Sequence, residues 1–419
     1  MKQETVAKQE TATDTKRIRT QDPSYDVIVV GGGPAGATAA TDLALRGVKV
    51  GLIDKEGRIK PCGGAIPPRL IRDFDIPADQ LKARIRSARI VAPSNEDADM
   101  AIDNGFVGMV DREHFDAWLR QRAWDAGADR LCGRYDGMTR QPDGTVSLRF
   151  APKDTDEPPR SLTARLIIAA DGANSAVRRD AMGPDRKPPY VFAYHEIVRS
   201  PDGPPNRCFD PERCDVYYQG RISPDFYGWV FPHGETTSVG VGSARKGFDL
   251  KQATALLRQA SGLEEAETIR VEGAPLPLKP LRRWDDGRNV ILAGDAAGVV
   301  APASGEGIYY AMLGGRLAAQ ACEKVLAEGK VKALATARKR FMAEHGRVFM
   351  ILGIMQYYWY ANDKRREKFV EICRDPDVQR LTWESYLNKK LVRRDPMAHI
   401  RVFFKDLGHM IGLTTAPKG

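Results

Sequence analysis

Three glycines near the N-terminus have the spacing of a phosphate-binding turn. Gly31, Gly33 and Gly36 form G-x-G-x-x-G directly after a short β-branched strand at residues 27–30. In such a turn the first glycine permits the sharp bend, the second lets the backbone approach a pyrophosphate, and the third lets the next helix pack against the strand. That helix, expected over residues 34–46, would begin with free N–H groups and a partial positive charge that favour phosphate.

An acidic residue follows this turn at the distance needed for a ribose. The second strand, expected over residues 48–53, stops at Asp54. A carboxylate about 20 residues after the glycines binds sugar hydroxyl groups in dinucleotide-binding units. One G-x-G-x-x-G alone is weak support, but here strand, turn, helix, second strand and acid occur in order. The sequence therefore predicts an α/β dinucleotide-binding unit.

Polar side chains also stand at the ends of three later elements. Asp171 follows a buried strand at 166–170, Asp295 follows another at 289–293, and Arg112 opens a helix whose expected N-cap is Asp111. Each alone could merely cap a helix or tighten a turn. Together with the glycine turn they favour a bound dinucleotide, because carboxylates bind sugar hydroxyls and a guanidinium binds phosphate.

Two further motifs carry a thiol and a set of aromatic rings. Pro61-Cys62-Gly63-Gly64-Ala65 lies in a loop, and Tyr227, Trp229 and Phe231 alternate along a strand that ends at Pro232. A lone cysteine between prolines and glycines is by default an inert small residue. Alternating aromatics form one face of a strand, and a core face and a substrate wall are both apolar. The residues alone leave these alternatives open.

The composition indicates a folded, soluble protein of more than one domain. The 419 residues exceed what one hydrophobic core usually supports, and the contents of 42% hydrophobic and 28% charged residues are ordinary. Six cysteines and six histidines are scattered without ligand spacing, which predicts no metal, no disulfide framework and a reducing compartment. Residues 1–22 are polar and predict a disordered tail without a signal peptide. No run reaches the ~18 apolar residues of a spanning helix.

The net charge of +9 raises the question of an acidic partner. No recognition motif supports nucleic acid. The apolar, aromatic-rich segment 348–361 precedes basic clusters, which suits an anionic membrane surface; an ordinary packed helix beside a solvated basic face is the alternative. These clusters are Lys364-Arg365-Arg366, Lys389-Lys390 and Arg393-Arg394.

Taken together, these motifs resemble those of the flavin-dependent class that contains aromatic hydroxylases and geranylgeranyl reductases. The P-C-G-G-A loop, the Y-G-W-V-F-P strand and the segment Pro302-Ala303-Ser304-Gly305-Glu306-Gly307-Ile308 are similar to motifs of the geranylgeranyl reductase family, over residues 25 to 400. The resemblance implies FAD and NADPH. The cofactor-binding residues that it implies are Gly31, Gly33, Pro34, Ala35, Gly36, Asp54, Lys55, Cys62, Gly63, Gly64, Arg112, Asp171, Gly172, Gly294, Asp295, Gly305, Gly307 and Ile308.

The implied fold is an α/β FAD-binding dinucleotide fold of the hydroxylase and glutathione-reductase type. It carries an antiparallel β-sheet substrate domain and a C-terminal helical region. We expect the FAD-binding domain to comprise residues 23–75, 105–185 and 273–332. The substrate domain would comprise 76–104 and 186–272, and the helical region 333–419.

The resemblance also implies an activity, namely hydrogenation of C=C bonds in a geranylgeranyl chain to give phytyl. The substrate would be a prenylated tetrapyrrole (chlorophyll or bacteriochlorophyll) or free geranylgeranyl diphosphate, reduced in the cytoplasm or at the inner photosynthetic membrane. Cys62 and then Tyr227 are the implied proton donors, and Tyr227, Trp229, Phe231 and Pro232 would line the substrate pocket. The alternatives are an aromatic monooxygenase on the same fold and a non-catalytic prenyl-binding carrier. The sequence determines neither the oligomeric state nor the head group.

Overall fold

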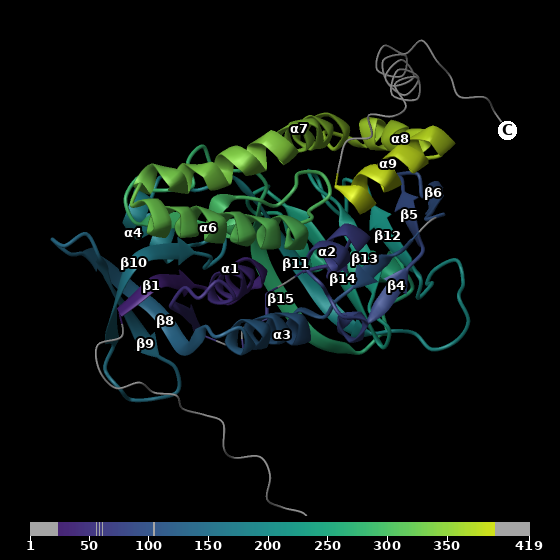
Figure 1. Ribbon diagram of the computed structural model, residues 1–419. Helices are drawn as coiled ribbons and strands as arrows, with labels where there is room; N and C mark the ends of the chain where they lie inside the picture. Colours follow the sequence, from purple (N-terminus) through teal and green to yellow (C-terminus); the bar gives the residue numbers. More distant parts are fainter. Residues whose placement is uncertain (1–23, 56, 58, 61, 104, 390–419) are drawn as a thin grey trace, which may run out of the picture.

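The computed structural model describes residues 24–55, 57, 59–60, 62–103 and 105–389. Two β-sheets lie side by side, and long helices cover both along one side (Figure 1). The expectations for residues 1–22, Pro61, Lys390 and Arg393-Arg394 fall outside the described residues.

The first sheet has a parallel centre in the order β8-β2-β1-β10-β16. β9 pairs antiparallel with the outer parts of β8 and β10. The parallel centre of this sheet is apolar and buried over residues 27–30, 50–53, 166–169 and 290–292, as expected for parallel strands covered on both faces. The strands are β1 (Ser24–Val30), β2 (Val50–Asp54), β8 (Asp129–Arg140), β9 (Val146–Pro152), β10 (Arg160–Ala169) and β16 (Val290–Leu292).

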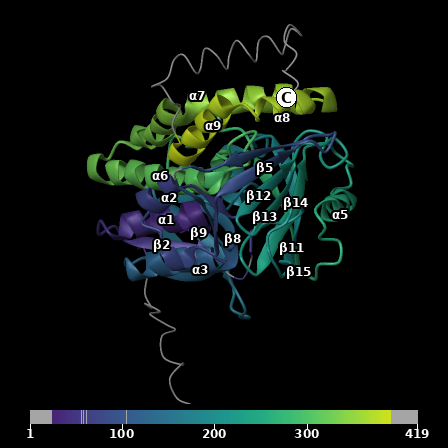
Figure 2. The ribbon, with the colours of Figure 1, turned by 90° about the vertical axis from the view of Figure 1, so that its right-hand side faces the viewer.

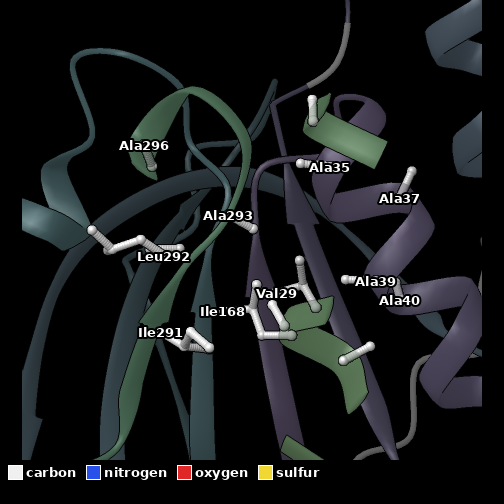
Figure 3. Packing of buried hydrophobic residues seen from close by; sticks show 14 of the residues in the cluster. Val29, Ala35, Ala37, Ala39, Ala40, Ile168, Ile291, Leu292, Ala293 and Ala296 are labelled. Carbon is white, nitrogen blue, oxygen red and sulfur yellow. The ribbon is translucent and has the colours of Figure 1, made fainter. Parts of the chain in front are cut away.

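Helix α1 (Pro34–Ala44) packs closely on this sheet because the residues on its buried side are small. Figure 3 shows Ala39 of α1 pointing toward Val29 of β1, which lies next to Ile168 of β10. Two more helices, α3 (Arg112–Asp125) and α6 (Ile308–Glu328), contact α1. The predicted N-cap of α3 is confirmed, since the Asp111 carboxylate accepts a hydrogen bond from Glu113 N at 2.8 Å.

The second sheet has seven strands in the order β15-β11-β14-β13-β12-β5-β6. All neighbours are antiparallel except β12 and β5. The antiparallel pattern predicted for residues 190–272 is thus confirmed. The strands are β5 (Ser87–Val91), β6 (Asp97–Ala101), β11 (Tyr190–Arg199), β12 (Arg213–Tyr217), β13 (Gly228–Pro232), β14 (Thr236–Ser243) and β15 (Thr268–Pro277).

Smaller elements join and flank the two sheets. Figure 2 shows α5 on the outer side of the seven-stranded sheet. A three-stranded sheet pairs β7 with both β3 and β4. These elements are β3 (Ala65–Ile66), β4 (Ala83–Ile85), β7 (Val107–Met109), α2 (Pro68–Asp73), α4 (Ala176–Met182) and α5 (Leu250–Ala260), with short 3-10 turns at Ala78–Gln80, Gly294–Ala297 and Val331–Leu334.

The C-terminal helices contact elements on the side of the first sheet and on the side of the second sheet. α7 packs on α6, α8 contacts β6, and α9 contacts α2. No helix within the described ranges combines the length and the apolar character needed to cross a bilayer. These helices are α7 (Ala335–Trp359), α8 (Asp363–Ile372) and α9 (Pro376–Asn388).

Candidate active site

The glycine turn lies at the carboxyl end of β1, at the edge where β2, β10 and β16 also end. Gly31 has φ +103°, and a Cβ there or at Gly36 would lie within 3.0 Å of backbone atoms. In contrast, nothing lies within 4 Å of the Cβ position of Gly33. Two glycines are therefore required by packing, and the third leaves open space in front of α1, where backbone approaches a pyrophosphate.

The N-terminus of α1 is suited to an anion. Gly33 is its N-cap, no side chain caps it, and no acidic residue stands in its first turn. Its first N–H groups and its dipole are thus directed at this space. The Asp54 carboxylate closes the edge, accepting a hydrogen bond from Gly32 N at 2.7 Å and lying 3.7 Å from the Arg120 guanidinium. Lys55 follows and is exposed. These residues fit the adenosine and pyrophosphate parts of FAD.

Asp171 caps the start of the helix that follows it, which is the alternative to cofactor binding that the sequence left open. Its carboxylate accepts hydrogen bonds from the Ser175 hydroxyl and from the N–H groups of Ala176 and Val177, the latter at 2.7 and 3.1 Å. Burial raises the pKa of Asp171, although these hydrogen bonds oppose the shift. Gly172 has φ +87° and nothing within 4 Å of its Cβ position. The Asp171-Gly172 turn therefore shapes the site through its backbone rather than through a free carboxylate.

Asp295 forms an ion pair with Lys60. Its side chain is 6% exposed and that of Lys60 is 32% exposed. Gly294 has φ +61°, and a Cβ there would lie 2.7 Å from Cβ of Ala35. The late Gly-Asp turn is thus packed directly against the start of α1. Lys60, which the sequence did not single out, adds a cation beside a carboxylate that is predicted to bind the cofactor.

The segment that precedes α6 contacts the aromatic strand. A Cβ at Gly305 would lie 2.7 Å from the Tyr227 hydroxyl, and this hydroxyl donates a hydrogen bond to Ser304 O at 2.7 Å. A Cβ at Gly307 would lie 3.3 Å from Val300, and Ile308 is the buried first residue of α6. The structure therefore brings the late motif and the start of β13 together.

The cysteine loop faces the same strand. A Cβ at Gly63 would lie 2.8 Å from the Phe231 ring, and one at Gly64 would overlap the carbonyl of Val110. Gly64 N lies 3.4 Å from Cys62 Sγ and donates to it. The glycines of this loop therefore let its backbone approach the Phe231 ring and the Val110 carbonyl closely.

Arg112 interacts mainly with a residue that the sequence reading missed. Its guanidinium makes a bidentate contact with Asp116, with Nε at 2.8 Å and Nη2 at 2.7 Å from the two carboxylate oxygens. Arg112 and Cys62 also line the same small cavity. Burial lowers the pKa of Arg112, but Asp116 and Cys62 outweigh burial and raise it above its usual value. Arg112 thus places a firmly held positive charge beside the thiol.

The aromatic face of β13 is buried and tightly packed. Tyr227 stacks on Phe226 with ring centroids 4.1 Å apart, and Trp229 meets it edge-on at 6.2 Å. Burial raises the pKa of Tyr227 well above its usual value. Pro232, which ends the strand, is also buried. This face belongs to an apolar cluster that extends to Trp359 at the end of α7.

A small cavity of about 20 Å³ lies between the cysteine loop, α3 and the second sheet. Cys62 and Arg112 line it on one side, and His195 and Glu272 line it on the other. Sequence reasoning missed His195 and Glu272 because each is an isolated polar residue in a strand. Only the pairing of β11 with β15 brings them together.

The glycine turn, the acidic edge and the sheet beside them define a flavin-dependent oxidoreductase. Comparison with known proteins gives the family. A family model described as lycopene cyclase protein matches residues 26–407. The chain is 57% identical over 389 residues to geranylgeranyl diphosphate reductase of Rhodobacter capsulatus, covering 93% of this chain and 98% of that one. It is 34% identical over 410 residues to the Synechocystis enzyme of the same name, covering 93% and 99%.

Solved structures give the same fold. A geranylgeranyl bacteriochlorophyll reductase-like protein from Thermoplasma acidophilum matches with a TM-score of 0.78 and 26% identity, covering 92% of this chain and 100% of that one. A flavin-dependent brominase matches with a TM-score of 0.71 and 17% identity, covering 93% and 100%, and this shows the fold alone. The family model names a cyclase, but the identities over nearly the whole chain are to reductases. The chain belongs to the geranylgeranyl reductase family, and its fold implies FAD.

Proposed function

We propose that the protein hydrogenates C=C bonds in the geranylgeranyl chain of chlorophyll or bacteriochlorophyll, or of geranylgeranyl diphosphate, with NADPH as reductant. The observation that carries this proposal is the 57% identity to the Rhodobacter capsulatus geranylgeranyl diphosphate reductase over 93% of the chain. The Cys62 loop and the aromatic face of β13 support it, because the loop carries one thiol and approaches the Phe231 ring of an apolar aromatic cluster.

The chain's own residues have three tasks in this reaction. Gly33, the N-terminus of α1, Asp54 and Asp295 would hold FAD, which when reduced supplies the hydride. The aromatic face would hold the alkene and exclude water. The remaining task is to provide the proton for the second alkene carbon.

Cys62 is better suited than Tyr227 to donate that proton. The Tyr227 hydroxyl is committed to the Ser304 carbonyl, and its raised pKa makes it a weaker acid. Cys62, in contrast, accepts a hydrogen bond from Gly64 N and lies beside the Arg112 guanidinium. The Gly64 N–H group and the nearby positive charge of Arg112 would favour the negative charge that remains on sulfur after proton transfer. Tyr227 then serves as a wall residue that fixes the loop at Ser304.

The prenyl substrate is a lipid, and α7 offers a surface that could meet a membrane. Met350, Ile354 and Tyr357 lie three and four residues apart on this helix and are 60%, 60% and 83% exposed. Lys364 at the start of α8 is exposed, whereas Arg366 is buried and donates to the Pro224 and Tyr360 carbonyls. The predicted basic cluster is therefore only partly a surface feature. We assign this apolar stripe to peripheral contact with an anionic membrane.

The decisive experiment is anaerobic. FAD-loaded protein, NADPH and geranylgeranylated bacteriochlorophyll are incubated, and the pigment is analysed by mass spectrometry. We expect gains of about two mass units per reduced bond, up to about six for three bonds. A parallel incubation with geranylgeranyl diphosphate compares the two substrate forms.

Two other outcomes would contradict the proposal. An unchanged prenyl chain together with oxygen-dependent NADPH oxidation would indicate the monooxygenase instead. A preparation that binds the pigment but takes up no FAD would indicate a carrier. Cys62→Ser tests the proposed donor, and Cys208→Ser, at an exposed position in a loop, is its matched control.

A further inference from the structure

A row of four residues crosses the second sheet on the side of the cysteine loop. Trp229 of β13 pairs with Gly240 of β14, Gly240 pairs with His195 of β11, and His195 pairs with Glu272 of β15. A Cβ at Gly240 would lie well under 3.0 Å from both Trp229 and His195. The glycine therefore lets the indole and the imidazole meet across the strand between them.

Hydrogen bonds join this row into one chain. Trp229 Nε1 donates to Ser238 Oγ at 3.0 Å, Ser238 Oγ lies 2.8 Å from His195 Nδ1, and His195 Nε2 lies 2.8 Å from Glu272. Trp229 can only donate, and the Glu272 carboxylate accepts. When Ser238 donates to Nδ1, Nε2 carries the proton toward Glu272. When the imidazole takes a second proton, Ser238 can accept from Nδ1. The chain therefore accommodates both charge states of His195.

The chain runs from the cavity toward solvent. His195 is 2% exposed and Glu272 lines the same cavity as Cys62. Arg270 forms an ion pair with Glu272 at 2.6 Å and with Asp111 at 3.6 Å, and its side chain is 24% exposed. A cavity of about 20 Å³ has room for one water among the groups that line it.

A purely structural role explains this arrangement poorly. Burying a carboxylate beside an imidazole costs desolvation free energy even when the two are hydrogen-bonded, so such a pair is weak support for a stability role. The pair also faces the thiol that the proposed reaction leaves without its proton. Its position therefore matches a need of the reaction more closely than a need of the fold.

We infer that His195 and Glu272 form a proton relay that restores the proton of Cys62 after each alkene reduction. In each cycle one alkene carbon receives a hydride from reduced flavin, and the other receives the proton of the Cys62 S–H bond. The imidazolium of His195 passes its Nε2 proton to the Glu272 carboxylate, and the resulting carboxyl group gives a proton through water in the cavity to the thiolate. Solvent returns that proton to the His195–Glu272 pair past Arg270. This relay rests on the proposed function.

The test separates the two halves of the catalytic cycle. FAD-loaded wild type, Glu272→Gln and His195→Gln are reduced with NADPH without oxygen and then mixed with geranylgeranylated bacteriochlorophyll over several turnovers. We expect unchanged flavin reduction and a turnover rate at least about 10-fold lower in both variants. The first turnover, which uses the proton already on Cys62, should be much less affected. Glu267→Gln, at an exposed ion pair with Arg199, is the matched control.

Two further readouts do not depend on the turnover rate itself. The ring nitrogens of labelled histidine in the cofactor-free protein should show neutral His195 as the Nε2–H tautomer, and Ser238→Ala should weaken that preference. The pH profile of turnover should change in Glu272→Gln but not in Glu267→Gln. The charged and titratable groups that line the cavity with His195 are Lys60, Cys62, Asp111, Arg112, His233, Arg270 and Glu272.

The outcomes distinguish the relay from the activity. If wild type reduces the prenyl chain and Glu272→Gln and His195→Gln turn over as fast, the relay is wrong and the proposed function stands. If first and later turnovers slow equally, the pair only supports the structure and the relay is also wrong. If wild type leaves the prenyl chain unchanged, both proposals are overturned.

Discussion

The glycine turn allows a prediction that separates folding from cofactor binding. Gly33→Ala places a methyl group where nothing lies within 4 Å, on a backbone with φ −74° that alanine adopts easily. Gly36→Ala places the same group well under 3.0 Å from the Gly31 carbonyl oxygen. The two substitutions are chemically identical and three residues apart. Gly33→Ala should nevertheless weaken FAD binding, whereas Gly36→Ala should lower the free energy of unfolding.

The magnitudes follow from these surroundings. For Gly33→Ala the loss of a favourable N-cap glycine and the reduced freedom of the unfolded chain oppose each other, so the free energy of unfolding should change by less than about 1 kcal/mol. The methyl group would occupy the open space, so FAD affinity should fall at least about tenfold, or about 1.4 kcal/mol. Gly36→Ala must displace backbone at the turn, which costs about 1–3 kcal/mol of stability.

Two measurements on the cofactor-free protein check this prediction. Urea unfolding gives the free energy of unfolding, and titration with FAD followed by quenching of flavin fluorescence gives the affinity. If Gly33→Ala bound FAD as tightly as wild type, the pyrophosphate would not lie at this turn. If Gly33→Ala lost as much stability as Gly36→Ala, the space in front of α1 would be filled by the protein itself. Either result would refute the reasoning.

Three further predictions concern the thiol of Cys62, the partly buried His233 and helix α7. Cys62→Ala should keep FAD and its reduction by NADPH but slow prenyl reduction at least about 100-fold, measured by mass spectrometry against Cys208→Ala. Burial lowers the pKa of His233 from 6.5 to about 4, so only the unfolded chain gains this proton as pH falls between these values. The free energy of unfolding should therefore fall by about 3 kcal/mol over this window, and His233→Asn should remove this part of the pH dependence in urea unfolding. Ile354→Glu on α7 should reduce the fraction of the protein that sediments with anionic vesicles. Leu256→Glu on α5 should leave this fraction unchanged.

The cofactor half of the site could be predicted because its signals are local. The strand, the glycine turn, α1 and the acid at Asp54 occupy about 30 consecutive residues, and each has its own short pattern. The predicted helix over 34–46 ends at Ala44, and the predicted strand over 48–53 begins at Val50. Such differences of two residues at element ends are expected, because ends fray and carry little pattern.

Contacts within one helix can be predicted only in part from the sequence. Asp116 stands four residues after Arg112, which is the spacing of facing side chains on a helix. The pair could therefore have been found, but the same spacing is common on exposed helices, where it signifies little. Burial distinguishes the Arg112–Asp116 pair from an ordinary exposed pair, and this burial depends on the packing of α3 against the rest of the fold.

Long-range partners could not be predicted, because no local pattern encodes them. Lys60 and Asp295 are 235 residues apart, and His195 and Glu272 are 77 residues apart. In both cases two separate surfaces must be docked before the contact exists. The basic cluster at Lys364 shows the same limit, since Arg366 is drawn inside by the Pro224 and Tyr360 carbonyls.

The pairing register of the second sheet determines whether the His195 chain exists at all. A shift of one residue turns every side chain of a strand to the opposite face. The only irregularity between β11 and β15 falls between Ile197 and Val198, two residues beyond His195. The regular pairing that ends there keeps His195 opposite Glu272, and the bulge changes the register only afterwards. A substitution that moved this bulge toward His195 would separate the imidazole from the carboxylate without altering either residue. The proposed relay therefore depends on a backbone feature that leaves no mark in the local residue pattern.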